Sequence, residues 1–488
     1  MVFYRLRCRS LRSLKTSGKP AFFNSRKRFS NACGYCNFEY FISFVSILPI
    51  DFFPQIGYNM TNLEFNSRLV TFLFGEVMNY IKRSIEEIVQ KNDKTFKCIL
   101  VTGARQTGKS TMIKKLFADK KYVSFDDPFI EEQAKENPNT FMMLNQPPVI
   151  YDEVQRVTDL FRYIKIKCDE EDGRGLFCLS GSQPFELMKN VSESLSGRVG
   201  IIEMSGLSLR EIMGDSFNKP FLPTMEYVQE RGKTAKQPQN IWQIIHRGGF
   251  PELQNPDIDW GTFYASYVKT YLERDVRSLS AVQSLDDFRK FMVAVAARTG
   301  QMLNYSNIAD EIGRDQGTVK NWISILEASG IIYLLEPYTS SVLKRTIKTP
   351  KLYFRDTGLA AYLTRWLTPE TLAVGAMSGA FFETFVISEI LKSYSNSGVD
   401  YRYCVSYYRG KDKKENSENE IDIIIEENGV LYPIEIKQGV KVTADETSAF
   451  TVLDKVENKK RGTGAIICMC PQPGALRENV LQIPVWYL

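Results

Sequence analysis

One stretch stands out when the sequence is read for chemistry: Gly103-Ala104-Arg105-Gln106-Thr107-Gly108-Lys109-Ser110. It matches the pattern G-x-x-x-x-G-K-[ST], whose glycines let backbone N–H groups turn inward around a phosphate. The apolar run 98–102 before it predicts a buried strand, and apolar residues at helical spacing after it, from Met112 to Phe117, predict a helix. A strand, a glycine loop and a helix are the context this motif needs, because the phosphate then lies at the positive end of a helix.

The loop predicts a P-loop NTPase that binds ATP with Mg²⁺ and is built to hydrolyse it. Lys109 is expected to bridge the β- and γ-phosphate oxygens, and the Ser110 hydroxyl to be a ligand of Mg²⁺. The cofactors that follow are ATP and Mg²⁺. The predicted nucleotide-binding residues are Gly103, Ala104, Arg105, Gln106, Thr107, Gly108, Lys109, Ser110 and Thr111.

A second element, Pro148-Val-Ile-Tyr-Asp152-Glu153, is an apolar run that ends in two acids. We expect Asp152 to hold Mg²⁺ through water, and Glu153 to orient and polarise the attacking water. An apolar run followed by two acids is common by itself. Here the two acids come downstream of Lys109, one strand further on in the alternation of strands and helices. That position favours an ATPase, because phosphoryl transfer mainly needs charges that are already in place.

Two further residues are predicted to approach the γ-phosphate. Ser182, or its neighbour Gln183, stands at the polar tip of a strand predicted over 176–179. Arg198 is expected to stabilise charge on the phosphate, either in its own chain or in a neighbouring one. The alternative for Arg198 is an ordinary solvated arginine in a loop.

The alternation of apolar runs and helical patterns predicts an α/β fold with a parallel sheet over residues 60–235. The expected strands are 98–102, 122–125, 149–151 and 176–179. A polar stretch at 229–240 suggests a boundary, followed by a mostly helical part, 236–368, and by a helix with strands, 369–488. Residues 1–59 lack core patterning, and we expect a basic extension, disordered or translated from a start codon assigned too early.

Composition limits the functions to consider. The net charge is +5, but residues 1–59 contribute nine basic and two acidic side chains, which leaves −2 for the remaining chain. Any nucleic-acid site must therefore be a local patch. His246 is the only histidine, which argues against histidine metal sites and His-dependent hydrolases. Scattered cysteines favour a reducing, cytoplasmic location, and no apolar run is long enough to predict a membrane span.

The chain resembles the AAA+ ATPases of archaea and bacteria whose AAA domain is followed by a C-terminal domain of unknown function. The likeness covers about residues 75–440 and rests on motifs in the family order. They are the phosphate loop, Val149-Ile-Tyr-Asp-Glu-Val-Gln155, Leu179-Ser-Gly-Ser-Gln183, Glu193-Ser-Leu-Ser-Gly-Arg198, Gly248-Gly-Phe-Pro-Glu252, Tyr271-Leu-Glu-Arg-Asp275, Pro350-Lys-Leu-Tyr-Phe-Arg-Asp-Thr-Gly358 and Glu435-Ile-Lys437. The resemblance implies an AAA+ fold, a winged helix and a restriction-nuclease-like end.

The middle of the chain has the order helix, turn, helix and hairpin, which is that of a winged helix. Gly313 suits the end of the first helix, and Trp322 lies on the apolar face of the second. The predicted DNA contacts are Thr318, Lys320 and Asn321 on the second helix, and Lys344 and Arg345 on a basic hairpin with Lys348 and Lys351. The alternative is a module that binds protein, since winged helices also serve that purpose.

The C-terminal part carries a carboxylate set. Asp422 and Glu435 lie on two runs that predict a hairpin around Asn428-Gly429, and Glu435 and Lys437 share one strand face. The resemblance to restriction-type nucleases implies that Asp422 and Glu435 bind Mg²⁺, that Lys437 polarises water and that Glu383 completes the shell. The alternative is a retained fold with charges on a solvated hairpin.

The sequence supports two functional hypotheses. The first is an ATP-regulated protein that binds or cuts DNA. The second is a nucleotide-dependent switch or scaffold that binds a protein partner and cuts nothing. Oligomerisation is compatible with both.

Overall fold

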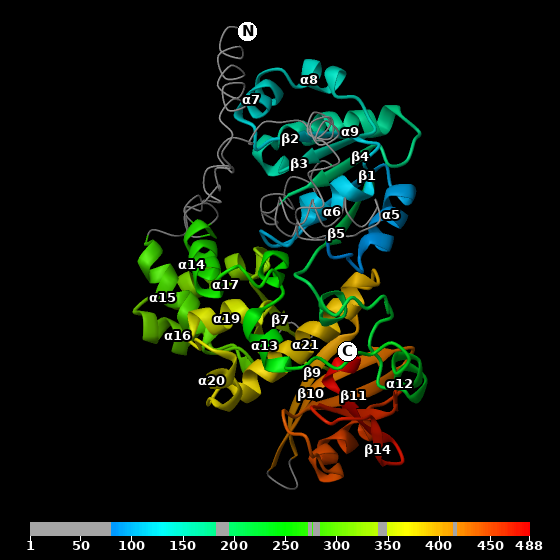
Figure 1. Cartoon of the computed structure of the whole chain (residues 1–488), viewed down its shortest axis with the longest axis vertical. Coiled ribbons are helices and arrows are strands. Elements are labelled where there is room, and N and C mark those ends of the chain that lie inside the picture. Colours follow the sequence, from blue (N-terminus) through cyan, green and yellow to red (C-terminus); the bar gives the residue numbers. More distant parts are fainter. Residues whose placement is uncertain (1–79, 182–194, 272–275, 277–283, 340–348, 413–416) are drawn as a thin grey trace, which may run out of the picture. The chain divides into compact units, whose positions relative to one another are not determined.

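The computed structural model describes residues 80–181, 195–271, 276, 284–339, 349–412 and 417–488 (Figure 1). The expected N-terminal extension, 1–59, lies outside these residues, as do Ser182, Gln183, Lys344 and Arg345. Residues from Tyr80 to Leu488 form one compact unit.

The first sheet is five-stranded, parallel and ordered β2-β3-β4-β1-β5, so the predicted α/β fold with a parallel sheet is confirmed. Its strands are β1 (Cys98–Thr102), β2 (Lys121–Ser124), β3 (Val149–Asp152), β4 (Phe177–Ser180) and β5 (Val199–Glu203). Four lie within one residue of the predicted bounds, and β5 was not predicted. Strands β1, β3 and β4 are buried along their whole length, which explains why they read as continuous apolar runs.

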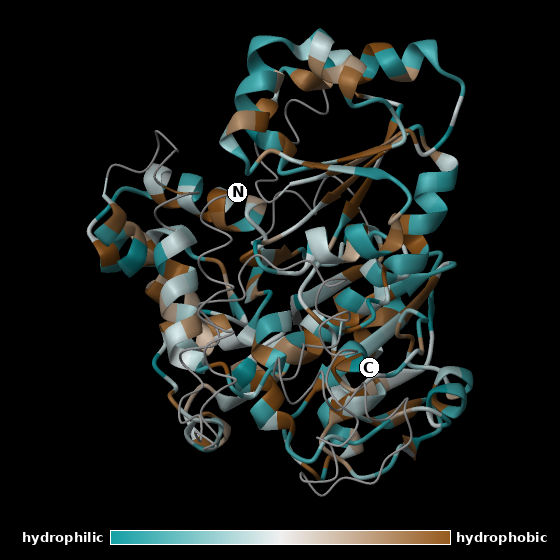
Figure 2. Cartoon of the chain, turned by 45° about the horizontal axis from the view of Figure 1, so that its top comes forward, coloured by the Kyte–Doolittle hydropathy of each residue, from teal (hydrophilic) through white to brown (hydrophobic). Residues whose placement is uncertain are grey.

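Helices cover both faces of this sheet. They are α5 (Glu86–Thr95), α6 (Lys109–Leu116), α7 (Pro128–Glu136), α8 (Pro138–Leu144) and α9 (Leu160–Glu170). Along β1, Ile99 and Val101 join the core that contains α5 and α6, whereas Cys98 and Leu100 join the core that contains α8 and α9. Figure 2 shows brown, hydrophobic strands in this sheet and mixed colouring on its helices.

The middle part is mostly helical, as expected. Within residues 236–368 its helices are α13 (Ile241–Arg247), α14 (Trp260–Tyr271), α15 (Leu285–Ala296), α16 (Tyr305–Ile312), α17 (Gln316–Ala328) and α19 (Thr357–Leu363). Helices α11 (Leu209–Ile212) and α12 (Met225–Arg231) precede this part, and α20 (Pro369–Val374) follows it. Strands β6 (Gln301–Met302), β7 (Ile332–Leu335) and β8 (Lys351–Phe354) form an antiparallel sheet in the order β6-β8-β7. Gly313 ends α16 with a φ of 67°, the left-handed conformation the sequence predicts there.

The C-terminal sheet has the order β14-β15-β13-β11-β10-β9, and β12 pairs with β11. Its strands are β9 (Val405–Asp412), β10 (Ser417–Glu427), β11 (Val430–Ile436), β12 (Lys460–Arg461), β13 (Gly464–Cys468), β14 (Gly474–Arg477) and β15 (Val480–Pro484). Helix α21 (Ser378–Asn396) precedes the sheet. The predicted hairpin is confirmed, because β10 and β11 pair antiparallel and Asn428 and Gly429 both have positive φ, at 50° and 80°.

The expected boundaries at 235 and 368 are not marked by a break in the hydrophobic core. Leu209 and Tyr227, expected to belong with the first sheet, pack into the same buried cluster as Phe382 and Leu488. The buried Arg210 also bonds the backbone carbonyl of Leu488. Among the residues that the structure describes, no helix has both the length and the apolar character needed to cross a membrane.

Candidate functional site

The phosphate loop joins β1 to α6 through a backbone that favours glycine at two points. Gly103 has a φ of 140°, and a Cβ built there would lie 2.1 Å from the carbonyl oxygen of Met204. Gly108 precedes the first turn of α6 with a φ of 89°. The two glycines of the motif therefore bring the backbone into a tight curve that ends at a helix N-terminus, where N–H groups favour an anion.

The side chains of Lys109 and Ser110 contact groups at the carboxyl ends of β1 and β3. The Lys109 ammonium donates to the carbonyl oxygens of Gly103, at 3.0 Å, and Ala104, at 2.7 Å. The Ser110 hydroxyl lies 3.1 Å from Oδ1 of Asp152. The loop and the acid at the end of β3 thus meet, as the sequence predicts.

Asp152 has two further partners that sequence reasoning missed. The hydroxyls of Ser180, at the end of β4, and Tyr122, in β2, both donate to its carboxylate. Strand β4 lies between β1 and β3, which brings Ser180 beside both motifs. Burial and the bond to Asp152 raise the pKa of Tyr122, so its hydroxyl stays protonated and remains a donor.

Glu153 follows Asp152 directly, outside the strand. Its backbone is left-handed, with a φ of 56°, so the chain turns sharply at the edge of the sheet. The side-chain amide of Gln155 donates to its carboxylate. Asp152 thus ends β3, whereas Glu153 begins the turn that follows it.

The structure corrects one expectation about Arg198. Strands β1 and β5 run parallel, and Arg198 immediately precedes β5, so it lies at the amino edge of the sheet, whereas the phosphate loop lies at the carboxyl edge. Five residues of strand separate the two, roughly 16 Å. Arg198 pairs instead with Asp169 at 2.5 Å. It therefore does not reach the loop of its own chain, and only contact with a neighbouring chain stays a prediction.

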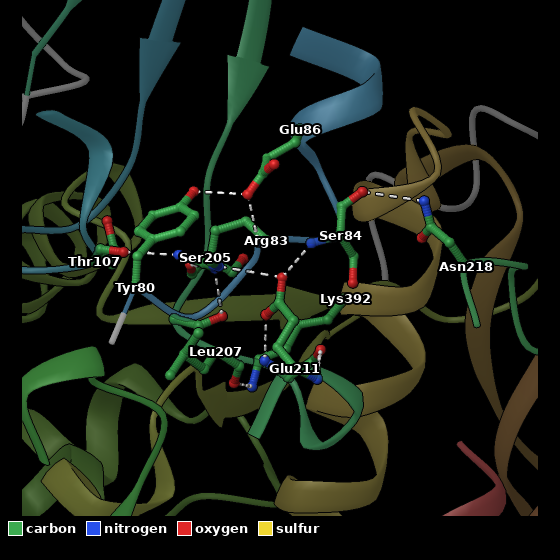
Figure 3. Close-up of polar contacts among 12 residues, drawn as sticks. Tyr80, Arg83, Ser84, Glu86, Thr107, Ser205, Leu207, Glu211, Asn218 and Lys392 are labelled. Atoms are coloured by element: carbon green, nitrogen blue, oxygen red, sulfur yellow. Dashed lines mark hydrogen bonds and ion pairs between the residues drawn. The ribbon is translucent and has the colours of Figure 1, made fainter. Parts of the chain in front are cut away.

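The segment that follows β5 passes behind the phosphate loop and contacts helix α21. Lys392 of α21 donates to the carbonyl oxygen of Leu207 at 2.9 Å, and the Glu389 carboxylate accepts from the Leu209 N–H at 2.7 Å. Figure 3 shows Lys392 and Leu207 in the same group of polar contacts as Thr107 of the loop, with Arg83 between them and Thr107. Two side chains of α21 thus hold this segment.

The residues at the loop fit ATP with Mg²⁺. The close approach of Gly103 to Met204 leaves no room for a side chain, and the Lys109 ammonium is already within the loop. Ser110 and Asp152 offer hard oxygen donors on adjacent elements, the kind that Mg²⁺ accepts.

The predicted nuclease residues also come together. The pairing of Ile423 with Ile434 sets Asp422 opposite Glu435, and Asp422 accepts from the Ile436 N–H at 2.9 Å. Lys437 lies 2.9 Å from the Glu435 carboxylate. Burial, with the Asp422 carboxylate nearby, raises the pKa of Glu383 to about 7 and that of Glu435 to about 8.

A buried lysine lies within this carboxylate cluster, which we define as Glu383, Glu420, Asp422 and Glu435. The Lys351 ammonium is 2.6 Å from Glu420, 3.4 Å from Glu383 and 3.8 Å from Asp422. Burial alone would lower the pKa of Lys351, but the carboxylates outweigh it and the pKa is raised. Lys351, expected on a basic hairpin that contacts phosphate, is therefore an internal counter-ion.

This cluster does not fit the metal that the resemblance implies. Lys351 already supplies positive charge among the carboxylates, and its side chain is only 5% exposed. Among the described parts of the chain, no three His, Cys, Asp or Glu side chains are arranged to hold a metal ion.

The expected DNA-contact residues on α17 lie on a mixed surface. The Thr318 hydroxyl bonds Asp315, the residue that caps the helix, at 2.5 Å. Lys320 and Asn321 are exposed, and the Lys320 ammonium lies over the Tyr305 ring. The acidic Asp315 thus lies beside Thr318 at the start of the helix, where it reduces the local positive charge.

Family models match three consecutive stretches of the chain. Residues 95–213 match a model described as an AAA domain, 238–370 a domain of unknown function (DUF8612), and 378–488 a domain of unknown function (DUF4143). The chain therefore contains an AAA-type ATPase domain, which implies nucleotide binding.

Two mycobacterial proteins, both described as uncharacterised, are similar over most of their length. One is from Mycobacterium bovis and one from Mycobacterium tuberculosis, and each is 26% identical over 351 residues, 70% of this chain and 70% of its own. Among solved structures, a Walker-type ATPase of Pyrococcus abyssi is 14% identical, with 58% of this chain and 96% of that chain covered and a TM-score of 0.36. A STAND-class signal transduction ATPase of Pyrococcus horikoshii is 9% identical, with 65% and 47% covered and a TM-score of 0.22.

Proposed function

We propose that the first sheet and its loop bind ATP with Mg²⁺ and hydrolyse the nucleotide. One observation carries the proposal: the Ser110 hydroxyl of the phosphate loop lies 3.1 Å from the carboxylate of Asp152. A glycine loop alone is a phosphate cradle, whereas a loop joined to a strand-end acid also provides the ligands of a metal. Glu153, the next residue, supplies a carboxylate for water.

Each residue has one task in this proposal. Lys109 neutralises charge on the β- and γ-phosphate oxygens, and the backbone N–H groups at the start of α6 bind the β-phosphate. Ser110 and Asp152 hold Mg²⁺, which when bound neutralises charge that develops on the phosphates. Glu153 orients a water and accepts its proton.

Measured phosphate release from ATP tests the proposal directly. The full chain should release phosphate with Mg²⁺ and lose this activity when the metal is chelated. Asp152→Asn should lower the rate by about a hundredfold, the range seen when ligands of a catalytic metal are disturbed. Absence of ATP binding and turnover in the unmodified chain would refute the proposal.

For the remaining chain we propose a nucleotide-dependent switch that binds a protein partner. In this proposal the elements α15, β6, α16, α17, β7 and β8 form a winged helix. The observation that favours a switch over a nuclease is the Lys351 ammonium among the carboxylates. DNA is the rival partner, through Lys320 and Asn321 of α17.

Incubation with DNA, Mg²⁺ or Mn²⁺, with and without ATP, separates the two. The switch predicts intact DNA under every condition, and weak binding at most. Metal-dependent cleavage, or binding that weakens steeply as salt rises, would favour the DNA-associated alternative.

A further inference from the structure

Arg83 lies directly behind the phosphate loop, although it is outside the motif and precedes β1. Its Nη1 donates to the carbonyl oxygen of Thr107, the residue before Gly108, at 2.8 Å. The side chain is 3% exposed, so this bond is shielded from water. Figure 3 shows Arg83 between Thr107, Ser205 and Glu211.

The bond to Thr107 fixes more than one carbonyl group. A peptide unit is planar and trans, so the carbonyl of Thr107 and the N–H of Gly108 point in opposite directions. Because Arg83 holds the carbonyl on the outer side of the loop, the Gly108 N–H is directed to the inner side. There it stands at the N-terminus of α6, where a phosphate binds.

A rotated peptide plane would have the opposite effect. It would direct the Thr107 oxygen at the phosphate and replace an attraction with a repulsion. Gly108 has no side chain to resist such a rotation, so the plane needs an external restraint. Arg83 is the restraint that the structure provides.

Arg83 is itself held rigidly on its other side. Its Nη2 donates to the carbonyl oxygens of Ser205, at 2.7 Å, and Gly206, at 3.2 Å, and its Nε to Glu211 at 3.1 Å. Glu211 is fixed in turn by the capping box at the start of α11 with Ser208. The planar guanidinium spans these partners and Thr107 at once, which an ammonium cannot do.

We propose that Arg83 is a positioning residue for nucleotide binding, which orients the Thr107–Gly108 peptide so that the Gly108 N–H meets the β-phosphate. The inference rests on the proposed function, because it needs nucleotide at this loop. The β-phosphate is bound in both ground state and transition state, so Arg83 contributes uniform binding. Its loss should therefore change affinity and leave the chemical step almost intact.

The test compares Arg83→Met with Lys120→Met in the full chain. Lys120 is also a buried cation, with a side chain 5% exposed, and it bonds Asp93 and the Gly175 carbonyl. It precedes β2, so it lies at the amino edge of the sheet, away from the loop. Affinities for ADP and ATP are measured by calorimetry with Mg²⁺, and turnover at saturating ATP is measured alongside.

Arg83→Met should raise the Kd for ADP and ATP by the same factor, roughly tenfold or more, because one charge-assisted donor is lost. KM should rise similarly, and kcat should stay within about threefold of the unmodified chain. Lys120→Met should lower the melting temperature without changing either Kd. If Arg83→Met does not fold, Arg83→Lys carries the test, with a Kd between those expected for Arg83→Met and the unmodified chain.

The contrary outcomes are distinct. Unchanged affinity in both Arg83 variants would make Arg83 a structural residue only. Equal loss of affinity in Lys120→Met would show that general destabilisation is responsible, and would also overturn the inference. If the unmodified chain binds neither nucleotide, the proposed function fails and the inference fails with it.

Discussion

The ammonium of Lys351 lies 2.6 Å from the carboxylate of Glu420, although Lys351 belongs to β8 and Glu420 to β10. One ion pair thus joins the three-stranded sheet to the C-terminal sheet. The same ammonium is within 4 Å of Glu383 on α21 and Asp422 on β10. Removing it would leave these carboxylates with much less positive charge nearby.

Lys351→Met should destabilise the chain by about 3 kcal/mol, the lower end of the range for breaking a buried pair, because Glu383 and Asp422 lose a buried counter-ion whereas Glu420 is 38% exposed. Urea denaturation at neutral pH measures the loss. Lys459→Met is the matched control. Lys459 pairs with Glu426 on the same sheet, but its side chain is 31% exposed, so the loss should stay below about 1 kcal/mol. Equal effects of the two substitutions would contradict the role given to Lys351.

Stability should depend on pH through Glu383 and Glu435, whose pKa values are raised to about 7 and about 8 by burial and by Asp422. In the unfolded chain both groups titrate near the ordinary value, so the folded state binds more protons between about pH 4.5 and 8. Their contribution is therefore present in acid and is lost as pH rises through the folded pKa values.

Glu435→Gln removes one of these groups and should flatten the profile. As pH rises from 5 to 8, the unmodified chain should lose more stability than the variant, so the difference in unfolding free energy between them should shift in favour of the variant. Denaturation midpoints at both pH values provide the comparison, and an unchanged difference would mean that Glu435 is not titrating there.

At the phosphate loop, Lys109→Ala and Glu153→Gln should fail differently. The first removes the charge that contacts the phosphates and should abolish nucleotide binding. The second keeps the shape of the side chain and loses the anion, so it should bind ATP without turning it over. Binding and phosphate release measured on the same preparations distinguish them, and wild-type turnover by Glu153→Gln would exclude Glu153 from catalysis.

The hydroxyls that hold Asp152 should also matter. Ser180→Ala removes a donor to this carboxylate and should lower ATP turnover by about tenfold while raising the Mg²⁺ concentration required, as losses around metal ligands do. Thr95→Ala serves as control, since its hydroxyl bonds only to the Lys91 carbonyl among the contacts described, on α5. The Mg²⁺ dependence of turnover is the readout, and identical curves would show that Ser180 has no part in it.

The sequence was most informative where structure depends on neighbours along the chain. The loop, Asp152 with Glu153, and the turn at Asn428-Gly429 have local signatures, and the structure places them as predicted. Strand β5 was missed because its burial alternates and it lacks a long apolar run. Its position also explains why Arg198 does not reach the loop of its own chain, one of the alternatives that the sequence left open.

Other partners had no local signal at all. Arg83 and Glu211 meet across 128 residues of sequence, and Ser180 reaches Asp152 only because β4 lies between β1 and β3. Lys351 was predicted to lie on a basic hairpin because basic residues precede it in the sequence. Its burial depends instead on α21 and β10, which come later in the chain. These contacts depend on the order of strands in the sheet and on the approach of distant segments, which composition and motif spacing do not predict.

Helix α21 has a consequence for how the chain opens. Its 19 residues, about 28 Å of helix, are buried on almost every side, with Glu383 in the carboxylate cluster and Lys392 on the segment behind the phosphate loop. Its central turns are buried, so their amides should exchange with solvent deuterium only when the whole unit unfolds. The exchange rate of these amides would then report the free energy of global unfolding. It would serve as an internal reference for any protection that nucleotide confers on amides elsewhere in the chain.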